Sequence, residues 1–321
     1  GETKIGIIGD TAQSIYKFQG ADHTQFQTFS LPNIKKFVLN ENRRSSNEII
    51  DSLNDLRKDI NQSKIRNVSI AKPIIFIGDM ILALRAAKTK CSNETIYTLS
   101  RDNITSNAMK AEINGSGLDS KLLEKQKEVD TNPKRSNMIY CCVKAIAYGK
   151  ENKFKDAIKV LEKQFNYKFD KTKGKKKALK YLTILLEKHS ELEGQSLLQF
   201  AAFIRENLVS DLANFRSGDI KTFYETHTLN QLLLCVSIPE DISLHKTIHK
   251  SKGDEFDNVL LVLNEEKDIN FLAECDLAAN EEHRINYVAL SRAKNRLFIS
   301  VPSIASNIQS SLSGFYDLEF L

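Results

Sequence analysis

The alternation of short apolar runs with helical stretches constrains the fold of this chain most. Apolar runs lie at residues 5–8, 36–39, 74–77, 96–99, 259–263 and 297–301. Their lengths suit buried parallel strands, which are covered on both faces. Helical stretches such as 47–59 and 281–293 lie between several of them. Because strands that alternate with helices build a parallel sheet, the sequence predicts an α/β fold.

The middle of the chain has a different pattern. From about residue 118 to residue 237 the strand-like runs give way to helical periodicity, as at Ala157, Val160, Leu161 and Phe165. We therefore expect an α/β domain that is interrupted by a mostly helical insertion and then resumes. Residues 168–180 hold seven lysines and one aspartate, the only strong charge run.

Length and composition set wider bounds. The 321 residues are enough for two sizeable cores. A net charge of +5 permits a nucleic-acid partner without requiring one. Five cysteines without metal-binding spacing predict reduced thiols and a cytoplasmic protein. No apolar run approaches the roughly 18 residues of a membrane span, and no signal peptide is apparent. Because the chain opens directly at an apolar run, we expect a piece of a longer protein.

The first polar segment, GDTAQSIYKFQGAD, occupies residues 9–22, just after the predicted strand 5–8. Parallel sheets bind ligands beyond the carboxyl ends of their strands. Gln13 could sense a terminal phosphate or orient a water. Tyr16 and Phe18 could stack on unpaired bases, or they could simply close the core.

The second segment, LNENRRSS, occupies residues 39–46 and leads into a predicted helix that Ser45 or Ser46 would cap. Arg43 and Arg44 at a helix start oppose its dipole unless an anion lies there. A nucleotide phosphate would supply that anion. The alternative is a solvated surface pair.

The third segment, TIHKSKGDEFDNV, occupies residues 247–259 and runs into a predicted strand. Thr247, His249, Lys252 and Gly253 form a loop rich in donors that suit phosphates. Glu255 could accept hydrogen bonds from a ribose. A purely structural role for the histidine stays open.

The fourth segment, EEHRINYVALSRAK, occupies residues 281–294, with Asn280 as the predicted helix cap. Ile285, Val288 and Arg292 share one helix face. An arginine that ends an apolar stripe needs an anion, because an unpaired buried guanidinium is costly. The anion could be a γ-phosphate from a neighbouring domain or the carboxylate of an internal salt bridge.

In this order the four segments resemble the later motifs of the UvrD/Rep/PcrA family of superfamily 1 DNA helicases. The family patterns are G-D-x-x-Q-S-I-Y, L-x-x-N-Y-R-S, T-x-H-x-x-K-G-x-E-F and E-E-x-R-x-x-Y-V-A-x-[ST]-R-A-K. SRDN at residues 100–103 is more weakly similar to the family's Y-R-T-N element. The resemblance implies a RecA-like parallel-sheet motor domain with a mostly helical inserted domain. It assigns residues 1–35 to the end of the first motor domain, 36–117 and 238–321 to the second, and 118–237 to the inserted arm.

The resemblance implies the C-terminal part of an ATP-dependent DNA helicase that translocates 3′ to 5′ on single-stranded DNA. It places Gln13, Arg44 and Arg292 on the γ-phosphate side of ATP. The remaining implied contacts are Arg43, Gly253 and Glu255 to ATP, and Tyr16, Phe18, Arg101, Asn103, Thr247 and His249 to DNA.

Several positions depart from the family pattern. Arg43 stands where the family has a tyrosine that stacks on adenine; a guanidinium can also stack, but adenine preference is in doubt. Phe18 replaces a tryptophan and offers a smaller stacking surface. Gln19 replaces an arginine and Asp254 a leucine, which weakens the expected local DNA contact.

The implied partners are single-stranded DNA and duplex junctions, with a nuclease or repair protein as a further candidate. Residues 168–180 would contact duplex DNA, unless they form a solvated loop. ATP and Mg²⁺ are implied for the full-length protein, but the sequence has no G-x-x-x-x-G-K-[ST] loop and no D-E-x-x motif. Magnesium ligands are therefore expected outside this chain, which alone should not hydrolyse ATP. The alternatives are a non-catalytic helicase-like binding module and a helicase-like subunit of a nuclease or phage-defence complex.

Overall fold

The computed structural model describes residues 5–114, 119–165, 171–216, 218–238 and 243–321. The chain divides into two compact units. We call the one built from Gly1–Ser116 and Ile242–Leu321 the sheet unit, and the one built from Gly117–Asp241 the helical unit. The assignment of particular segments to two motor domains and an arm stays a prediction.

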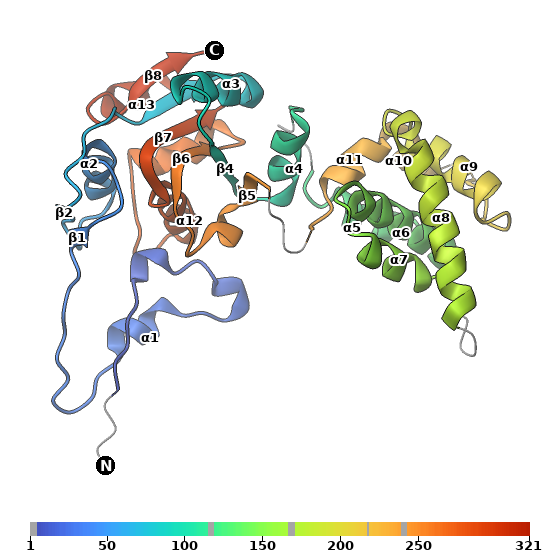
Figure 1. The fold of residues 1–321 in the computed structure, drawn as a ribbon, viewed down its shortest axis with the longest axis horizontal. Coiled ribbons are helices and arrows are strands. Elements are labelled where there is room, and N and C mark those ends of the chain that lie inside the picture. Colours follow the sequence, from blue (N-terminus) through green and yellow to red (C-terminus); the bar gives the residue numbers. More distant parts are fainter. Residues whose placement is uncertain (1–4, 115–118, 166–170, 217, 239–242) are drawn as a thin grey trace. The chain divides into compact units, whose positions relative to one another are not determined.

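A six-stranded sheet organises the sheet unit (Figure 1). Every neighbouring pair is parallel, in the order β5-β4-β6-β7-β3-β8. This arrangement confirms the predicted parallel-sheet α/β class. The strands are β3 (Ile74–Ile77), β4 (Tyr97–Ser100), β5 (His245–Thr247), β6 (Phe256–Val262), β7 (Ala293–Val301) and β8 (Asp317–Phe320); β1 (Glu41–Asn42) and β2 (Ser63–Lys64) form a separate parallel pair.

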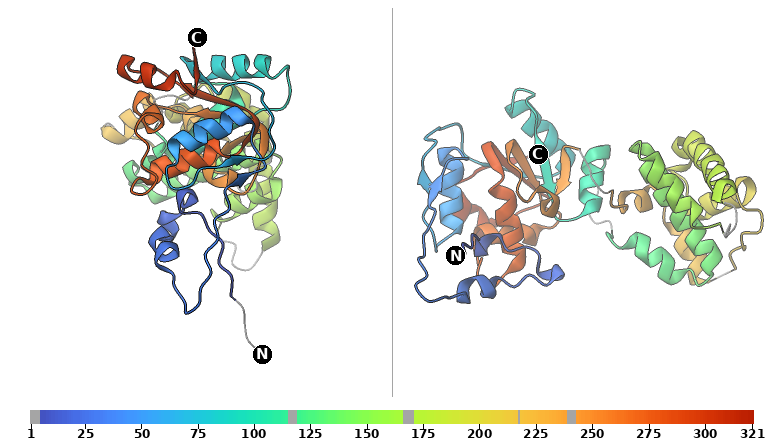
Figure 2. Two further views of the ribbon diagram at one scale, coloured as in Figure 1. Left: turned by 90° about the vertical axis from the view of Figure 1, so that its left-hand side faces the viewer. Right: turned by 60° about the horizontal axis from the view of Figure 1, so that its bottom comes forward.

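Helices cover the sheet. Leu99, Leu261, Ile299 and Ile75 are in register across four strands and belong to one buried core. Helices α2 and α12 contribute to the same core and lie side by side (Figure 2). The helices of this unit are α1 (His23–Thr28), α2 (Asn47–Leu56), α3 (Met80–Lys90), α4 (Asn103–Ala111), α12 (Glu281–Leu290) and α13 (Ser306–Leu312), with 3-10 helices η1 (Thr11–Gln13), η2 (Lys17–Gln19), η3 (Ile248–Ser251) and η4 (Glu266–Leu272).

Two of the predicted strands are wrong. Residues 5–8 and 36–39 form no strand, and Ile8 and Phe37 are 92% and 85% exposed. A short apolar run becomes a strand only where another strand takes up its backbone hydrogen bonds. Among the described residues no strand pairs with either run. Their apolar side chains are therefore left on the surface.

The described elements of the helical unit are helices, as the periodicity predicted, and Ala157 and Leu161 are buried. Around them Arg135 makes a buried bidentate pair with Asp130, which also accepts a hydrogen bond from Tyr224. Residues 168–170 of the lysine run lie outside the described residues. The helices are α5 (Leu122–Val129), α6 (Pro133–Lys150), α7 (Phe154–Glu162), α8 (Lys171–Leu192), α9 (Leu197–Asn207), α10 (Asp219–Thr226) and α11 (Leu229–Leu234).

Within the described ranges, no helix is both long enough and apolar enough to cross a membrane.

Candidate functional site

Helix α12 is the centre of the candidate site. Asn280 caps its start, as predicted, and accepts hydrogen bonds from two backbone N–H groups of the first turn. The segment that carries η1 packs along α12 (Figure 2). Arg284 donates from Nε to the carbonyl of Ser14, at 2.8 Å. Lys17 donates its backbone N–H to Glu281, at 3.1 Å. These contacts bring the first and the fourth sequence segments together.

Arg292 lies just beyond α12, in the turn that leads into β7. The predicted helix over 281–293 is too long, because α12 ends at Leu290. Ser291 is its C-cap and donates its backbone N–H to the carbonyls of Ala289 and Tyr287. Arg292 is nevertheless only 3% exposed. Its guanidinium donates hydrogen bonds to the backbone carbonyls of Val288 and Asp254, at 3.1 and 3.2 Å. It also donates to the side chains of Ser291 (Oγ, 2.8 Å) and Gln13 (Oε1, 3.2 Å).

All four acceptors around Arg292 are neutral. Within the part of the chain that the structure describes, no carboxylate forms an ion pair with it. Burial, and next the charge of Arg44, lower the pKa of Arg292 to about 10. Burial and the neighbouring Arg292 likewise lower the pKa of Lys252. Arg292, Arg44 and Lys252 thus lie close enough to interact, and we call them the cationic cluster. An anion bound beside the buried Arg292 would offset the cost of burying its charge.

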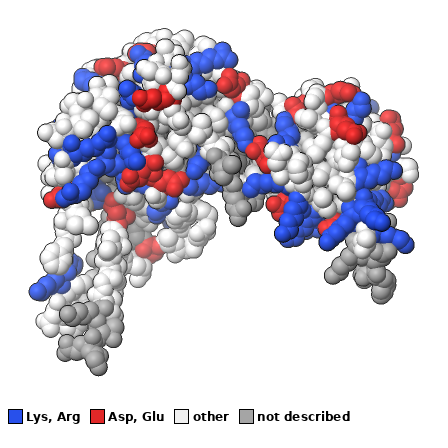
Figure 3. Space-filling view, in the orientation of Figure 1, with Lys and Arg blue, Asp and Glu red and all other residues white. Residues whose placement is uncertain are grey.

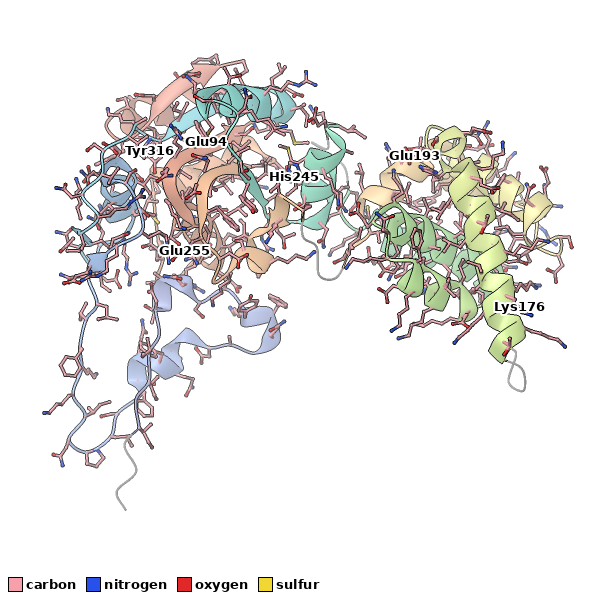
Figure 4. All side chains as sticks on the ribbon, in the orientation of Figure 1. Glu94, Lys176, Glu193, His245, Glu255 and Tyr316 are labelled. Carbon is pink, nitrogen blue, oxygen red and sulfur yellow. The ribbon has the colours of Figure 1, made fainter. Side chains whose placement is uncertain are left out.

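Arg44 lies beside Arg292 and has a carboxylate partner. Its Nη2 lies 2.6 Å from Glu255 Oε1, and its Nη1 donates to the carbonyl of Ser291 at 2.9 Å. The Arg44 hydrogen bond lowers the pKa of Glu255. Glu255 directly precedes β6 and therefore lies at the amino-terminal end of this strand (Figure 4). Gly253, just before it, has a φ of 97°, a left-handed conformation that favours glycine.

Arg43, by contrast, is not brought into this group. Its side chain is 71% exposed and pairs with Glu41 at 2.5 Å. Helix α2 starts after Ser46, one of the two predicted caps, although its side chain makes no capping bond.

Gln13 has a defined orientation in the structure. Its Nε2 donates to Asp10 Oδ2 at 2.7 Å, while its Oε1 accepts from Arg292. Asp10 in turn accepts from Arg57 Nη1 at 2.8 Å. Sequence reasoning missed Arg57, because it lies outside all four segments and no local pattern marks it.

An aromatic cluster adjoins the cationic cluster. Tyr16, Phe18 and His249 have ring centroids 5.4–5.9 Å apart. Tyr16 donates its hydroxyl to the carbonyl of His249, and His249 Nε2 lies 3.0 Å from the carbonyl of Ile15. Phe18 is 69% exposed. Lys252 Nζ lies 4.8 Å from the centroid of the Tyr16 ring, which places the aromatic cluster beside the cationic cluster.

The remaining predicted residues lie at the carboxyl ends of β4 and β5. Arg101 follows β4 and makes a bidentate pair with Glu282 at 2.7 and 2.8 Å. Asn103 begins α4, and Thr247 ends β5, where it is buried. Glu255 and Arg292, in contrast, lie just before β6 and β7. The predicted residues are therefore divided between the carboxyl ends and the amino ends of the parallel strands.

The geometry defines a class of protein: a parallel-sheet α/β domain with a cationic cluster and an adjoining aromatic cluster. The family described as the UvrD-like helicase C-terminal domain matches residues 38–303, most of the chain. The chain therefore belongs to the UvrD-like helicase C-terminal domain family. A comparison with curated proteins gives no match. The match begins after the first segment, so Gln13, Tyr16 and Phe18 lie outside it.

Proposed function

We propose that this chain supplies one side of the ATP site and part of the DNA track of an ATP-dependent DNA helicase that moves 3′ to 5′ on single-stranded DNA. In this proposal residues 1–35 end the first motor domain, residues 36–117 with 238–321 form the second, and 118–237 form the arm. The exposed apolar runs at 5–8 and 36–39 would be buried against the remainder of the first motor domain.

The buried and unneutralised charge of Arg292 is the observation that supports ATP as the ligand. A guanidinium is planar and permanently charged, so it suits a phosphate that approaches from outside the fold. Arg44 and Lys252 add positive charge next to it, and Gln13 contacts it directly. Such donors stabilise the charge that develops on a transferring phosphoryl group.

Mg²⁺ would neutralise phosphate charge during hydrolysis, as it does in related nucleotide hydrolases. Among the described residues, no group of three or more His, Cys, Asp or Glu side chains could hold a metal ion. In this proposal the arginines assigned to ATP contribute positive charge and hydrogen bonds.

The aromatic cluster supports single-stranded DNA as the second ligand. Base stacking on an aromatic side chain is worth about 1–3 kcal/mol and tolerates any sequence. Phe18 exposes its ring beside the half-buried Tyr16 and His249. Arg101 binds Glu282 through Nε and Nη2, which leaves its Nη1 group to donate to a phosphate while the carboxylate offsets part of its charge.

The helical unit supports a contact with duplex DNA. Residues 117–241 hold 22 lysines and arginines against 17 aspartates and glutamates, so this unit accounts for the whole net charge of +5. Lysines and arginines gather beside the start of α8 (Figure 3). Such a surface binds phosphates without reading sequence.

The experiment measures ATP turnover. The gene upstream of Gly1 is read for a G-x-x-x-x-G-K-[ST] loop, and DNA-stimulated turnover is measured for the full-length protein and for this chain. We expect turnover only in the full-length protein. Arg292→Ala should lower it by at least about a hundredfold, since comparable arginines contribute about 10³–10⁵. Arg85→Ala on the exposed side of α3 is the matched control.

Two outcomes would contradict the proposal. Steady turnover by this chain alone, lost on Arg292→Ala, would show that it carries a complete site. Near-normal turnover in full-length Arg292→Ala would remove the assignment of that residue. A full-length protein that binds DNA without ATP turnover would instead favour the non-catalytic binding module.

A further inference from the structure

Arg57 is a buried arginine that contacts two carboxylates, one near in sequence and one distant. It is the C-cap of α2, directly after Leu56, and only 6% of its side chain is exposed. Its Nε and Nη2 donate to the two oxygens of Asp59 at 2.7 and 3.1 Å. Its Nη1 donates to Asp10 Oδ2 at 2.8 Å, across 47 residues of sequence. Asp59 leaves Nη1 without an acceptor, and Asp10 supplies one from a different segment of the chain.

Asp10 accepts hydrogen bonds from both Arg57 and Gln13. Its Oδ1 accepts from the backbone N–H of Ala12, and its Oδ2 accepts from both Arg57 and Gln13 Nε2. With Nε2 bound to a carboxylate, the carbonyl oxygen of the Gln13 amide must face the opposite way. It meets Arg292 there, at 3.2 Å. A flipped amide would set oxygen against carboxylate and N–H against guanidinium, and both bonds would be lost.

We propose that Arg57 is a positioning residue that acts through Asp10 to hold Gln13 in the orientation that meets Arg292. This inference rests on the proposed function, since the phosphate end of an ATP site is where that orientation would matter. The chain of contacts joins α2, the η1 segment and the turn after α12. Gln13 lies in η1, outside every strand of the sheet. Its side chain is held by the hydrogen bonds to Asp10 and Arg292.

The expected cost of losing this contact follows from the precision that catalysis requires. A misplacement of about 1 Å can reduce a rate by about a hundredfold. Arg57→Gln should therefore lower the turnover of the full-length protein by about ten- to a hundredfold. The KM for ATP should change by less than about threefold, because Arg57 itself touches no phosphate in this arrangement. Arg57→Lys should recover part of the rate, because lysine retains a cation that can reach one carboxylate.

A double-mutant cycle separates positioning from general stability. If Arg57 acts through Gln13, Arg57→Gln should cause no further loss of turnover in a Gln13→Ala background. Asp59→Asn is the matched control, because it removes the other carboxylate of the same guanidinium and leaves the Asp10 contact in place. This control should keep turnover within about threefold. Thermal unfolding of each variant shows whether it is folded.

Losses that multiply in the double variant, or an Asp59→Asn loss equal to that of Arg57→Gln, would overturn the proposal. If Arg57→Gln does not fold, Asp10→Asn replaces it in the cycle, since the amide has the same shape. The proposed function fails in a different way. In that case Gln13→Ala and Arg292→Ala would both leave turnover unchanged, whatever Arg57 does.

Discussion

Inorganic pyrophosphate should raise the thermal stability of this chain through Arg292. The protein holds a buried guanidinium among neutral acceptors, and its pKa falls to about 10. At about 1.4 kcal/mol per pH unit, the folded protein disfavours the charged form by roughly 3 kcal/mol relative to an ordinary arginine. An anion that restored the ordinary pKa of Arg292 would recover about that free energy. The corresponding Kd is on the order of 10 mM.

The expected shift follows by linkage. At about ten times the Kd, a ligand that binds only the folded state stabilises it by about 1.4 kcal/mol. For a unit of roughly 200 residues this raises the Tm by about 3–6 °C. Pyrophosphate also stabilises proteins in general by exclusion from their surface. The specific effect is therefore the difference between the wild type and Arg292→Gln.

The assay is thermal unfolding with about 100 mM pyrophosphate, compared with sodium chloride of equal ionic strength. Arg85→Gln is the matched control, because its side chain is 63% exposed and lies on α3, outside the candidate site. Wild type and Arg85→Gln should show the full shift, and Arg292→Gln only the general part of it. Equal shifts in all three proteins would refute the reasoning that connects the charge of Arg292 to an anion site.

Three further predictions follow from the surface and from titration. Phe18→Ala should weaken single-strand binding by about 1–3 kcal/mol at every salt concentration, whereas Leu82→Ala, an exposed apolar residue of α3, should not; fluorescence anisotropy with a labelled oligonucleotide measures both. Neutralising residues 175–177 should flatten the salt dependence of forked-DNA binding through lost counterion release, and an unchanged slope would make the run a solvated loop. Burial lowers the pKa values of His249 and His283 below 6.5, so the unfolded chain binds protons that the folded chain does not. Stability should therefore fall as the pH drops below about 6.5, by at most about 1.4 kcal/mol per pH unit for each histidine, and a Tm that stays constant from pH 7.5 to 5.5 would contradict this.

The sheet could be predicted where apolar pattern and strand pairing agree. The runs at 74–77, 96–99, 259–263 and 297–301 became β3, β4, β6 and β7, because each lies between two neighbouring strands. Strands β5 and β8 were missed. They lie at the two edges of the sheet and contain polar residues such as His245 and Asp317, so neither has the continuous apolar pattern of a buried strand.

Local signals predicted helix starts better than helix ends. Asn280 and Ser46 were recognised because a cap is a property of one residue and the turn after it. The end of α12 was not, since the apolar pattern continues into β7 without a glycine or proline. The motif nevertheless identified Arg292 as a buried arginine, although it lies in a turn rather than on the helix.

The partners of the charged residues could not be read from the sequence, and they decide which arginine gains most from a bound anion. Arg44 meets Glu255 across 211 residues, and Arg101 meets Glu282 across 181. At each of these two, a carboxylate already offsets the charge of the guanidinium, which weakens its attraction for a phosphate. Arg292 has no carboxylate to give up among the described residues. A phosphate would therefore supply the first anion that contacts Arg292. We accordingly expect Arg292 to contribute more free energy of phosphate binding than Arg44 or Arg101, and the thermal-unfolding assay with pyrophosphate tests this.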